Sequence, residues 1–299
     1  MRVAITGASG LIGTATSAAL RARGDEVTPV SRRAKPGGIQ WDPLAGFDPP
    51  ERLSGYDAVI NLAGESIAGR WTATKKERIM ASRIAATKAV VAAFRAAEPR
   101  PRILINASAT GIYGDRGDER LDEDSSLGPE GEFLCDVARA WEGAAREVEA
   151  LEGPSVRLCL ARFGVVLDRE GGALGKMMTP FKLGAGGKIG SGRQWMPWVH
   201  VEDAVAALLF LLDHAETRGA YNLVAPSPVR NLEFTRGLGK ALHRPTLLPL
   251  PKFGVKLALG EMGEALLLDG QRAVPKRLVD AGFEFSFAEL DAAFASLLD

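Results

Sequence analysis

Short apolar runs alternate with longer amphipathic segments through the first two thirds of the chain. The apolar runs predict buried strands over residues 3–5, 26–31, 57–64, 102–107, 156–163 and 221–224. Apolar positions at helical spacing predict helices over 11–23, 133–151 and 201–214, and a long helix that follows the capping-box sequence Thr74-Lys75-Lys76-Glu77 and includes Phe94. Strands that alternate with helices in this way predict an α/β fold with a doubly wound parallel sheet.

The pattern changes beyond residue 167, where glycines and short apolar segments replace the strand and helix alternation. We expect 34–55 and 115–132 to be loops, 165–167 to extend the preceding strand, and 177–183 and 287–298 to be helices, with two or three short helices after residue 227. The predicted division is a sheet domain of residues 1–167 and 201–225, and a smaller C-terminal α+β substrate lobe of residues 168–200 and 226–299.

A glycine turn follows the first strand. Gly7 permits the tight turn, Gly10 lets a pyrophosphate approach the backbone, and Gly13 lets the next helix pack closely on the strand. The amides of the helix start would then face the phosphates. An ordinary strand-to-helix turn is the alternative interpretation. The predicted cofactor-binding residues in this segment are Thr6, Gly7, Ser9, Gly10, Leu11, Ile12 and Gly13.

The end of the second predicted strand indicates which dinucleotide the turn would hold. An acidic residue usually stands there in NAD-binding sheets, but this chain has Ser31, Arg32 and Arg33. A carboxylate would repel a 2′-phosphate, whereas a guanidinium can pair with it, so the sequence predicts NADP as the cofactor. A solvated basic loop is the alternative.

Small and hydroxyl-bearing residues mark the carboxyl ends of two further strands. The predicted cofactor-binding residues Leu62, Ala63 and Gly64 end one strand, where the small Ala63 and Gly64 leave room for a cofactor. Ser108, Thr110 and Tyr113 place hydroxyls where doubly wound sheets bind ligands. Arg83, within the long helix, is either a charge on the rim or a group directed at the site.

Composition excludes several classes of protein. The 37 basic and 37 acidic residues among 299 give no net charge to attract nucleic acid or anionic lipid. The 2 cysteines lie in apolar surroundings, and the 3 histidines form no cluster with metal-ligand spacing, so we expect reduced thiols and no metal. The chain shows no signal-peptide pattern and no apolar run of membrane-spanning length. We therefore expect a cytoplasmic protein that binds a small-molecule substrate and has no nucleic-acid or membrane partner, with a homodimer as a candidate assembly.

Several motifs together resemble the extended short-chain dehydrogenase/reductase superfamily. They are TGASGLIG at 6–13, NLAG at 61–64, SATGIYG at 108–114, RFGVVL at 162–167 and WVHVED at 198–203. The GRW segment at 69–71, SRIAAT at 82–87 and AGFEFSFAEL at 281–290 resemble its atypical, NAD(P)-dependent epimerase-like branch. The resemblance implies a Rossmann domain that binds NADP, with Arg162 among the cofactor-binding residues, and a smaller substrate lobe.

One departure from this family pattern concerns catalysis. Typical members carry Tyr-x-x-x-Lys on the helix after the SATGIYG-like segment, and here Phe133 and Val137 stand at those positions. Phenylalanine cannot transfer a proton, and valine cannot hold a ribose. Cys135 and Arg139 share the spacing and could be an unusual substitute. The predicted catalytic candidates are Ser108, Thr110, Tyr113 and Cys135.

Two functions of different class remain open. The first is an NADP-dependent oxidoreductase or epimerase acting on a small polar or nucleotide-sugar-like substrate; the second is a catalytically weak or inactive NADP-binding sensor or regulatory protein. For the enzyme, we expect residues 177–198 to fold over the strand ends, with Trp195, Met196, Pro197 and Trp198 lining the cleft. Packing between the lobes is the alternative role of these four residues.

Overall fold

The structure, a computed structural model, describes residues 1–33 and 36–298. Its main feature is an eight-stranded sheet with the order β12-β8-β6-β5-β1-β2-β3-β4. All neighbouring strands run parallel except β3 and β4, which are antiparallel. The strands of this sheet are β1 (Arg2–Thr6), β2 (Glu26–Ser31), β3 (Ile39–Asp42), β4 (Gly46–Phe47), β5 (Ala58–Asn61), β6 (Ile103–Ala109), β8 (Arg157–Phe163) and β12 (Gly219–Leu223).

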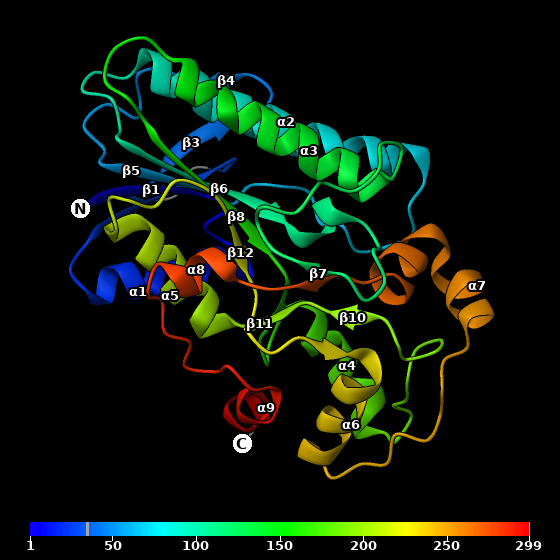
Figure 1. The fold of residues 1–299 in the computed structure, drawn as a ribbon. Coiled ribbons are helices and arrows are strands. Elements are labelled where there is room, and N and C mark those ends of the chain that lie inside the picture. Colours follow the sequence, from blue (N-terminus) through cyan, green and yellow to red (C-terminus); the bar gives the residue numbers. More distant parts are fainter. Residues whose placement is uncertain (34–35, 299) are drawn as a thin grey trace.

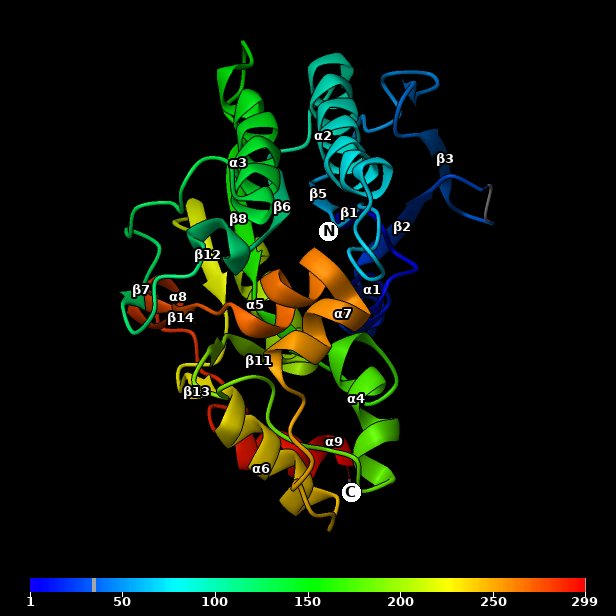
Figure 2. The ribbon, with the colours of Figure 1, turned by 90° about the vertical axis from the view of Figure 1, so that its right-hand side faces the viewer.

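Helices cover both faces of this sheet (Figure 1). On one face α2 (Ala73–Ala96) and α3 (Phe133–Arg146) lie side by side, as Figure 2 also shows. On the other face lie α1 (Leu11–Ala22) and α5 (Val201–Asp213). The predicted doubly wound Rossmann fold is therefore confirmed, and the strand order reverses between β1 and β5, where such sheets bind ligands.

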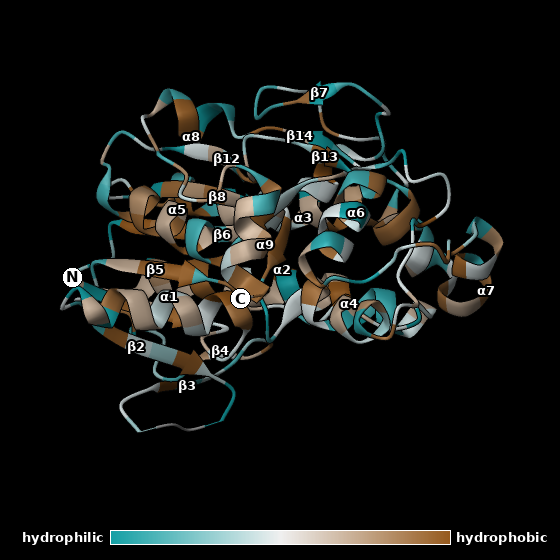
Figure 3. Ribbon diagram, turned by 90° about the horizontal axis from the view of Figure 1, so that it is seen from below, coloured by the Kyte–Doolittle hydropathy of each residue, from teal (hydrophilic) through white to brown (hydrophobic). Residues whose placement is uncertain are grey.

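Two apolar layers hold the helices on the sheet. Val59, Leu104 and Phe94 belong to the layer under α2, and Ile5, Ile60 and Leu208 to the layer over α5; all six side chains are fully buried. Figure 3 shows the resulting concentration of hydrophobic residues in the central strands. Strands that are buried on both faces have continuous apolar sequences, which is why the sequence predicted them well.

A second group of elements lies beyond the carboxyl ends of the strands, at the lower right of Figure 1. A cluster of buried apolar side chains that includes Phe181, Phe234 and Phe294 joins its helices α4, α6 and α9. The remaining elements are β7 (Arg120–Leu121), β9 (Val165–Leu167), α4 (Gly172–Lys182), β10 (Trp195–Met196), β11 (Trp198–His200), β13 (Val229–Arg230), α6 (Asn231–Ala241), α7 (Lys252–Gly263), β14 (Arg272–Ala273), α8 (Lys276–Asp280) and α9 (Leu290–Leu298). Short 3₁₀ helices cover Thr110–Tyr113 (η1) and Glu147–Ala150 (η2), and one π-helical turn covers Glu264–Leu268 (η3).

The structure corrects four expectations about local structure. The predicted loop 34–55 contains β3 and β4, which extend the sheet at its edge; Ala34 and Lys35 lie outside the described residues. The residues 165–167 form a separate strand, β9, which pairs with β11. The chain changes direction at Gly164, whose backbone passes so close to Pro197 that a Cβ would lie 2.4 Å from its carbonyl oxygen.

The other two corrections concern helix ends. The long helix is capped by Thr72, whose hydroxyl accepts a hydrogen bond from the Lys75 amide, and not by Thr74. The helix predicted over 133–151 ends at Arg146 and continues as η2. Within the described residues, no helix is long and apolar enough to cross a membrane. The same part of the chain holds no group of three or more side chains that could bind a metal ion.

Candidate functional site

The glycine turn between β1 and α1 has the geometry of a phosphate-binding loop. Gly7 has a φ of +65°, and a Cβ on it would lie 2.6 Å from the Leu62 carbonyl oxygen. A Cβ on Gly13 would lie 2.3 Å from the Gly7 carbonyl oxygen. Gly10, in contrast, is exposed, and its Cβ would approach only the Gly7 carbonyl oxygen, at 3.4 Å. Gly7 and Gly13 are thus required for the turn itself, whereas Gly10 leaves the outer side of the turn open.

The backbone amides at the start of α1 complete this loop. Gly10 donates its amide to Gly7, and Thr14 donates its amide to Gly10. The amides of residues 11, 12 and 13 have no hydrogen-bond acceptor within the described chain. They lie at the N-terminus of α1, which is the positive end of the helix dipole. A pyrophosphate would satisfy them.

A ladder of buried polar side chains fixes the strand ends beside this turn. The Thr6 hydroxyl donates to Asn61 Oδ1 at 2.6 Å and accepts from the amides of Leu62 and Ala63. Asn61 donates in turn to Asn106 at 2.6 Å. Thr6 therefore shapes the Leu62–Ala63 corner through its hydroxyl, and the predicted small residues of that corner lie directly against Gly7.

The predicted 2′-phosphate group at the end of β2 is open to solvent. Arg32 and Arg33 are exposed, and within the described chain neither guanidinium makes a hydrogen bond or an ion pair. The Ser31 hydroxyl donates to the Arg33 carbonyl at 2.6 Å, which holds the backbone of this loop. Arg32 also lines a cavity of about 540 Å³ with the β3–β4 hairpin. Two exposed cations at this position fit a cofactor phosphate.

Arg83 reaches the same edge of the sheet from α2. Its guanidinium packs on Gly64 and donates to the Glu65 and Ile79 carbonyls, both at 3.0 Å. It also lies 5.0 Å from the centre of the Trp141 ring. Burial lowers the pKa of Arg83 to about 10, so the side chain stays positively charged at neutral pH. Arg83 is therefore a fixed cation beside Gly64, and not a loose charge on the rim.

Ser108 and Arg162 form a buried network with Glu142, which the sequence did not single out. The Ser108 hydroxyl donates to Glu142 Oε1 at 2.7 Å, and Arg162 donates to both carboxylate oxygens, at 2.7 and 2.9 Å. Burial alone would lower the pKa of Arg162, but the Glu142 carboxylate outweighs burial and raises it. The Ser108 proton is committed to Glu142, so this hydroxyl is not free to donate to a substrate.

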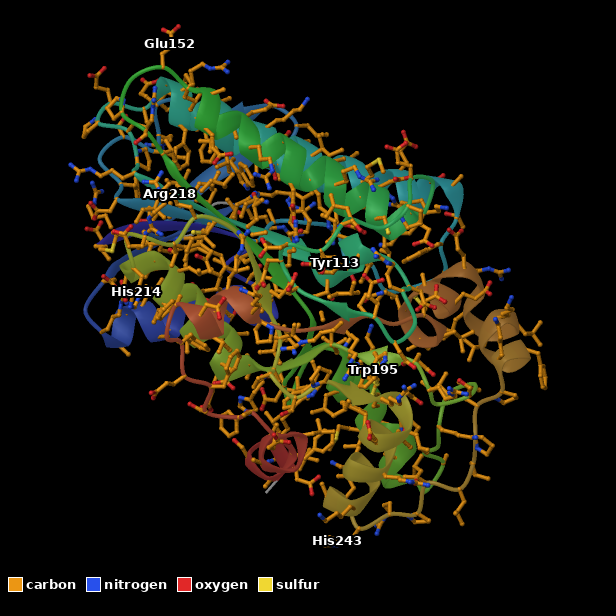
Figure 4. All side chains as sticks on the ribbon, in the orientation of Figure 1. Tyr113, Glu152, Trp195, His214, Arg218 and His243 are labelled. Carbon is orange, nitrogen blue, oxygen red and sulfur yellow. The ribbon has the colours of Figure 1, made fainter. Side chains whose placement is uncertain are left out.

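Tyr113 continues the same network and is fully buried. Its hydroxyl accepts from Arg162 and donates to Asn222 Oδ1, both at 2.8 Å. Burial raises the pKa of Tyr113 to about 12. Figure 4 shows Tyr113 in the interior, where the sheet meets the second group of elements. Through these two hydrogen bonds Tyr113 links η1 to the neighbouring strands β8 and β12.

Cys135 is also buried. Its thiol lies 3.3 Å from the Gly111 carbonyl oxygen and 3.2 Å from a Glu132 carboxylate oxygen. Burial, and then the hydrogen bond to Glu132 and the charge of that carboxylate, raise the pKa of Cys135 to about 12. A thiol in this setting stays protonated and is a poor nucleophile or base.

Thr110 differs from the other three catalytic candidates. It is 3 % exposed, at the start of η1, but its hydroxyl makes no hydrogen bond within the described chain, and its oxygen is not sealed from the surface. It precedes Gly111, which lines the cavity described next. Of the four candidates, Thr110 thus has the hydroxyl that remains available to a ligand.

A cavity of about 300 Å³ opens beside Gly111 at the start of α3. Trp71 and Phe133 form an aromatic corner, with ring centres 4.9 Å apart and planes at 70°. The opposite wall comes from the end of α7 and from η3. The complete lining is Trp71, Gly111, Gly114, Asp115, Gly131, Glu132, Phe133, Leu134, Glu261, Glu264, Ala265, Asp269 and Gln271.

The segment 195–198 does not line this cavity. Trp198 is 1 % exposed and packs in the cluster around Phe234, so it serves packing within the second group of elements. Trp195 lies between the guanidinium groups of Arg230 and Arg272, 4.5 and 4.7 Å from its ring centre, and donates to Asp118. This stretch thus lies outside the cavity beside Gly111.

Comparison with known proteins places this geometry in a family. The model of the "NAD dependent epimerase/dehydratase family" matches residues 3–223. The chain belongs to this family. A "domain of unknown function (DUF1731)" matches residues 250–297, the part of the family member that supplies one wall of the cavity.

Relatives over the whole length support this membership. The chain is 40 % identical to the human "epimerase family protein SDR39U1" and to the Bacillus subtilis "epimerase family protein YfhF", covering all of this chain and 100 % and 98 % of theirs. A crystal structure of human SDR39U1 with NADPH superposes with a TM-score of 0.92 at 40 % identity, covering 100 % of this chain and 99 % of that one. MoeE5 in complex with UDP-glucose and NAD, at 21 % identity and a TM-score of 0.77, shares the fold.

This epimerase-family member has no tyrosine or lysine on α3. Phe133 contributes its ring to the cavity, and Val137 is 5 % exposed and packs with Trp71 and Ile79. Sequence reasoning missed Glu142 and the acidic wall from residues 261–271. Glutamate is common in helices, so Glu142 did not stand out in the sequence. The one available signal was its place among the apolar positions of α3, because glutamate is rarely buried.

Proposed function

We propose that this protein binds NADPH and transfers hydride between this cofactor and a carbonyl or hydroxyl group of a small molecule in the cavity beside Gly111. The observation that carries the proposal is the glycine turn, where Gly10 is exposed and the first amides of α1 have no acceptor within the described chain. Two exposed arginines, Arg32 and Arg33, follow the neighbouring strand β2. The NADPH in the human relative's crystal structure supports it. Cytoplasmic location is part of the proposal, and so is a division into two domains, 1–167 with 201–225 and 168–200 with 226–299, which share one apolar layer.

The residues of the chain would divide the work as follows. The turn amides and Arg32 hold the phosphates, and Arg83 places a fixed positive charge beside Gly64. NADPH, when bound, supplies the hydride. Thr110 donates a hydrogen bond to the substrate oxygen, and the proton for that oxygen comes from solvent, because Tyr113 and Cys135 are buried with high pKa values. Without a tyrosine–lysine pair, turnover should be slower by about 10² to 10⁴.

The experiment that tests this proposal separates binding from chemistry. Gly10→Ala adds a methyl group on the open side of the turn, so we expect NADPH affinity to fall about tenfold or more while the free energy of unfolding changes by less than about 1 kcal/mol. Thr110→Val should keep NADPH affinity within a few-fold and lower turnover of an identified carbonyl substrate by about 10². Both are measured by NADPH titration and by nicotinamide absorbance with a panel of ketones, aldehydes and sugars. Unchanged NADPH affinity in Gly10→Ala would refute the cofactor site.

A second candidate function is an NADPH-binding sensor without catalytic activity. It is favoured by the burial of Tyr113 and by the hydrogen bond that Ser108 donates to Glu142, because both hydroxyls are then withheld from a substrate. A protein with this site can bind NADPH and turn nothing over, in which case it would act as a sensor. NADPH binding that Gly10→Ala removes, without turnover of any compound in the panel, would favour this function.

A further inference from the structure

The walls of the cavity beside Gly111 carry an excess of negative charge. Among the described residues, no lysine or arginine lines it. Ammonium groups neutralise two of its carboxylates: Lys76 lies 2.6 Å from Glu261, and Lys256 lies 2.5 Å from Glu264. Within the described chain the other three carboxylates have no ion pair. They are Asp115, Glu132 and Asp269.

These carboxylates act on one another across the cavity. Partial burial raises the pKa of Asp269, and the neighbouring charges of Asp115, Glu132 and Glu264 raise it further. Like charges thus converge on one space from the loop after η1, from the start of α3 and from η3. The charge of Lys252 acts on Asp269 in the opposite direction, but it does not cancel these contributions, because the pKa of Asp269 remains raised.

The aromatic corner provides a second and independent observation. The Lys76 ammonium lies 4.7 Å from the centre of the Phe133 ring while it pairs with Glu261. Two lining residues, Phe133 and Glu261, thus already hold an ammonium group of the chain between an aromatic ring and a carboxylate. An aromatic ring with nearby carboxylates is the chemistry by which proteins recognise organic cations.

We propose that this cavity selects a substrate that carries a positively charged nitrogen, an ammonium or guanidinium group, next to an apolar portion. The apolar portion would lie against Trp71, Phe133 and Leu134, and the cation would lie among Asp115, Glu132 and Asp269. A nucleotide diphosphate, which brings phosphate charges, would be repelled by the same carboxylates. This inference rests on the proposed function, since it names the substrate class of that site.

The test compares two probes of one size and opposite charge. Phenethylamine and 3-phenylpropionate each join a phenyl ring to a short chain, and UDP-glucose serves as the nucleotide-sugar probe. Binding to the full chain saturated with NADP⁺ is measured by calorimetry at low salt. We expect phenethylamine to bind about tenfold or more tightly than 3-phenylpropionate, because three unpaired carboxylates within several ångströms each contribute about fourfold. Equal or tighter binding of 3-phenylpropionate or UDP-glucose, or no binding of phenethylamine, overturns the proposal.

Two variants locate the effect. Asp115→Asn and Asp269→Asn keep the side-chain shape, so each should weaken phenethylamine binding by about threefold to fivefold, with the double variant weaker still. Glu216→Gln is the control, because Glu216 is exposed, lies outside the cavity and makes no ion pair within the described chain. Unchanged phenethylamine affinity in the double variant, with a normal circular dichroism spectrum, overturns the proposal.

The outcomes for the cofactor and for the cavity are distinguishable. If the protein binds no NADPH but prefers phenethylamine, the proposed function fails and the charge selectivity of the cavity stands. If the protein binds NADPH but prefers UDP-glucose, the cofactor site stands and the cationic substrate class fails.

Discussion

The polar residues at the strand ends have two different roles. Thr6, Ser108 and Tyr113 use their hydroxyl protons within the chain, on Asn61, Glu142 and Asn222. Arg32 and Thr110 keep their polar groups free within the described chain. A buried hydroxyl that is already paired cannot serve a ligand without leaving its partner unsatisfied, which costs about 1–3 kcal/mol. We therefore expect Arg32 and Thr110, rather than the paired hydroxyls, to contact a ligand.

Arg32 should determine the choice between NADPH and NADH. A charge-assisted hydrogen bond to the 2′-phosphate contributes about 1.5–3 kcal/mol, so NADPH should bind about 10- to 150-fold more tightly than NADH. Arg32→Ala should reduce this ratio about tenfold or more, as measured by titration with both cofactors. Arg218→Ala should leave the ratio unchanged, because Arg218 is exposed (Figure 4) and immediately precedes edge strand β12, which three other strands separate from β1. Equal affinity of the natural protein for both cofactors would contradict the assignment.

The two thiols should be unreactive in the folded protein. Burial raises the pKa of Cys159, and it raises the pKa of Cys135 to about 12, so both remain protonated at pH 8. Iodoacetamide at pH 8 should label neither in the native protein within the time that labels both in urea, as mass spectrometry would show. Because an unfolded thiol ionises near pH 8.5, the unfolding free energy should fall as pH rises from about 8.5 toward 12. Rapid native labelling of Cys135 would show that its site opens.

The sequence identified the right residue types at this scale but not their partners. It placed hydroxyls at the end of β6 because those strand ends are ligand sites. It could not show that Ser108 and Tyr113 are consumed by Glu142 and Asn222, because these partners lie 34 and 109 residues away. Contacts between distant segments have no local pattern in the sequence.

Among the elements, prediction succeeded where burial imposes a period on the sequence. The bounds of β2 were predicted as found, and α1 and α5 within one residue, because each has a continuous buried face. Prediction failed for β3 and β4, whose four and two residues are too short to show a period. The prediction that 165–167 extend the preceding strand failed because the chain changes direction at Gly164. That turn depends on a close contact with Pro197, which comes much later in the sequence.

The start of α2 offers a matched pair of substitutions. Thr72 accepts a hydrogen bond from the Lys75 amide at 3.2 Å, whereas Thr74 lies exposed inside the first turn. Thr72→Ala should lower the unfolding free energy by about 1 kcal/mol, since a free helix-terminal amide loses its acceptor. Thr74→Ala should be neutral or slightly stabilising, because alanine favours helix. Urea unfolding measures both, and an equal loss in the two variants would contradict the observed cap.

Across the whole molecule, the C-terminal segment returns to the sheet domain. Leu278, Phe283 and Phe285 pack into the same apolar layer as α5, and Asn222 on β12 donates to the Val274 carbonyl at 3.0 Å. β14 also pairs with β7. The proposed boundary at residue 225 thus separates segments that share one core.

This shared core predicts one cooperative unfolding transition. Urea midpoints from tryptophan fluorescence and from far-ultraviolet circular dichroism should coincide, because loss of the C-terminal segment opens the layer around α5. Leu278→Ala, at a fully buried position, should lower both midpoints together by removing about 2–5 kcal/mol of stability. Val279→Ala, at a neighbouring exposed position, is the control. Two separated transitions would instead support independent domains.

The same arrangement limited what the sequence could say of the cavity. Gly111 and Phe133 were within reach of motif reasoning, but the wall from residues 261–271 has no motif, and its acids appear as ordinary helix charges. The acidic residues of this wall lie in the same cavity as Asp115 only because the C-terminal part of the chain folds back beside the start of α3.

The position of that wall in the chain also sets an order of events during synthesis. The glycine turn is translated by residue 13, the sheet gains its edge strand β12 at residue 223, and the cavity is not enclosed until residue 271. At about 5–20 residues per second, roughly 13–52 s separate the turn from the last wall residue. A nascent chain thus carries the glycine turn long before the cavity beside Gly111 is complete, and for the first part of that interval its sheet lacks the edge strand β12.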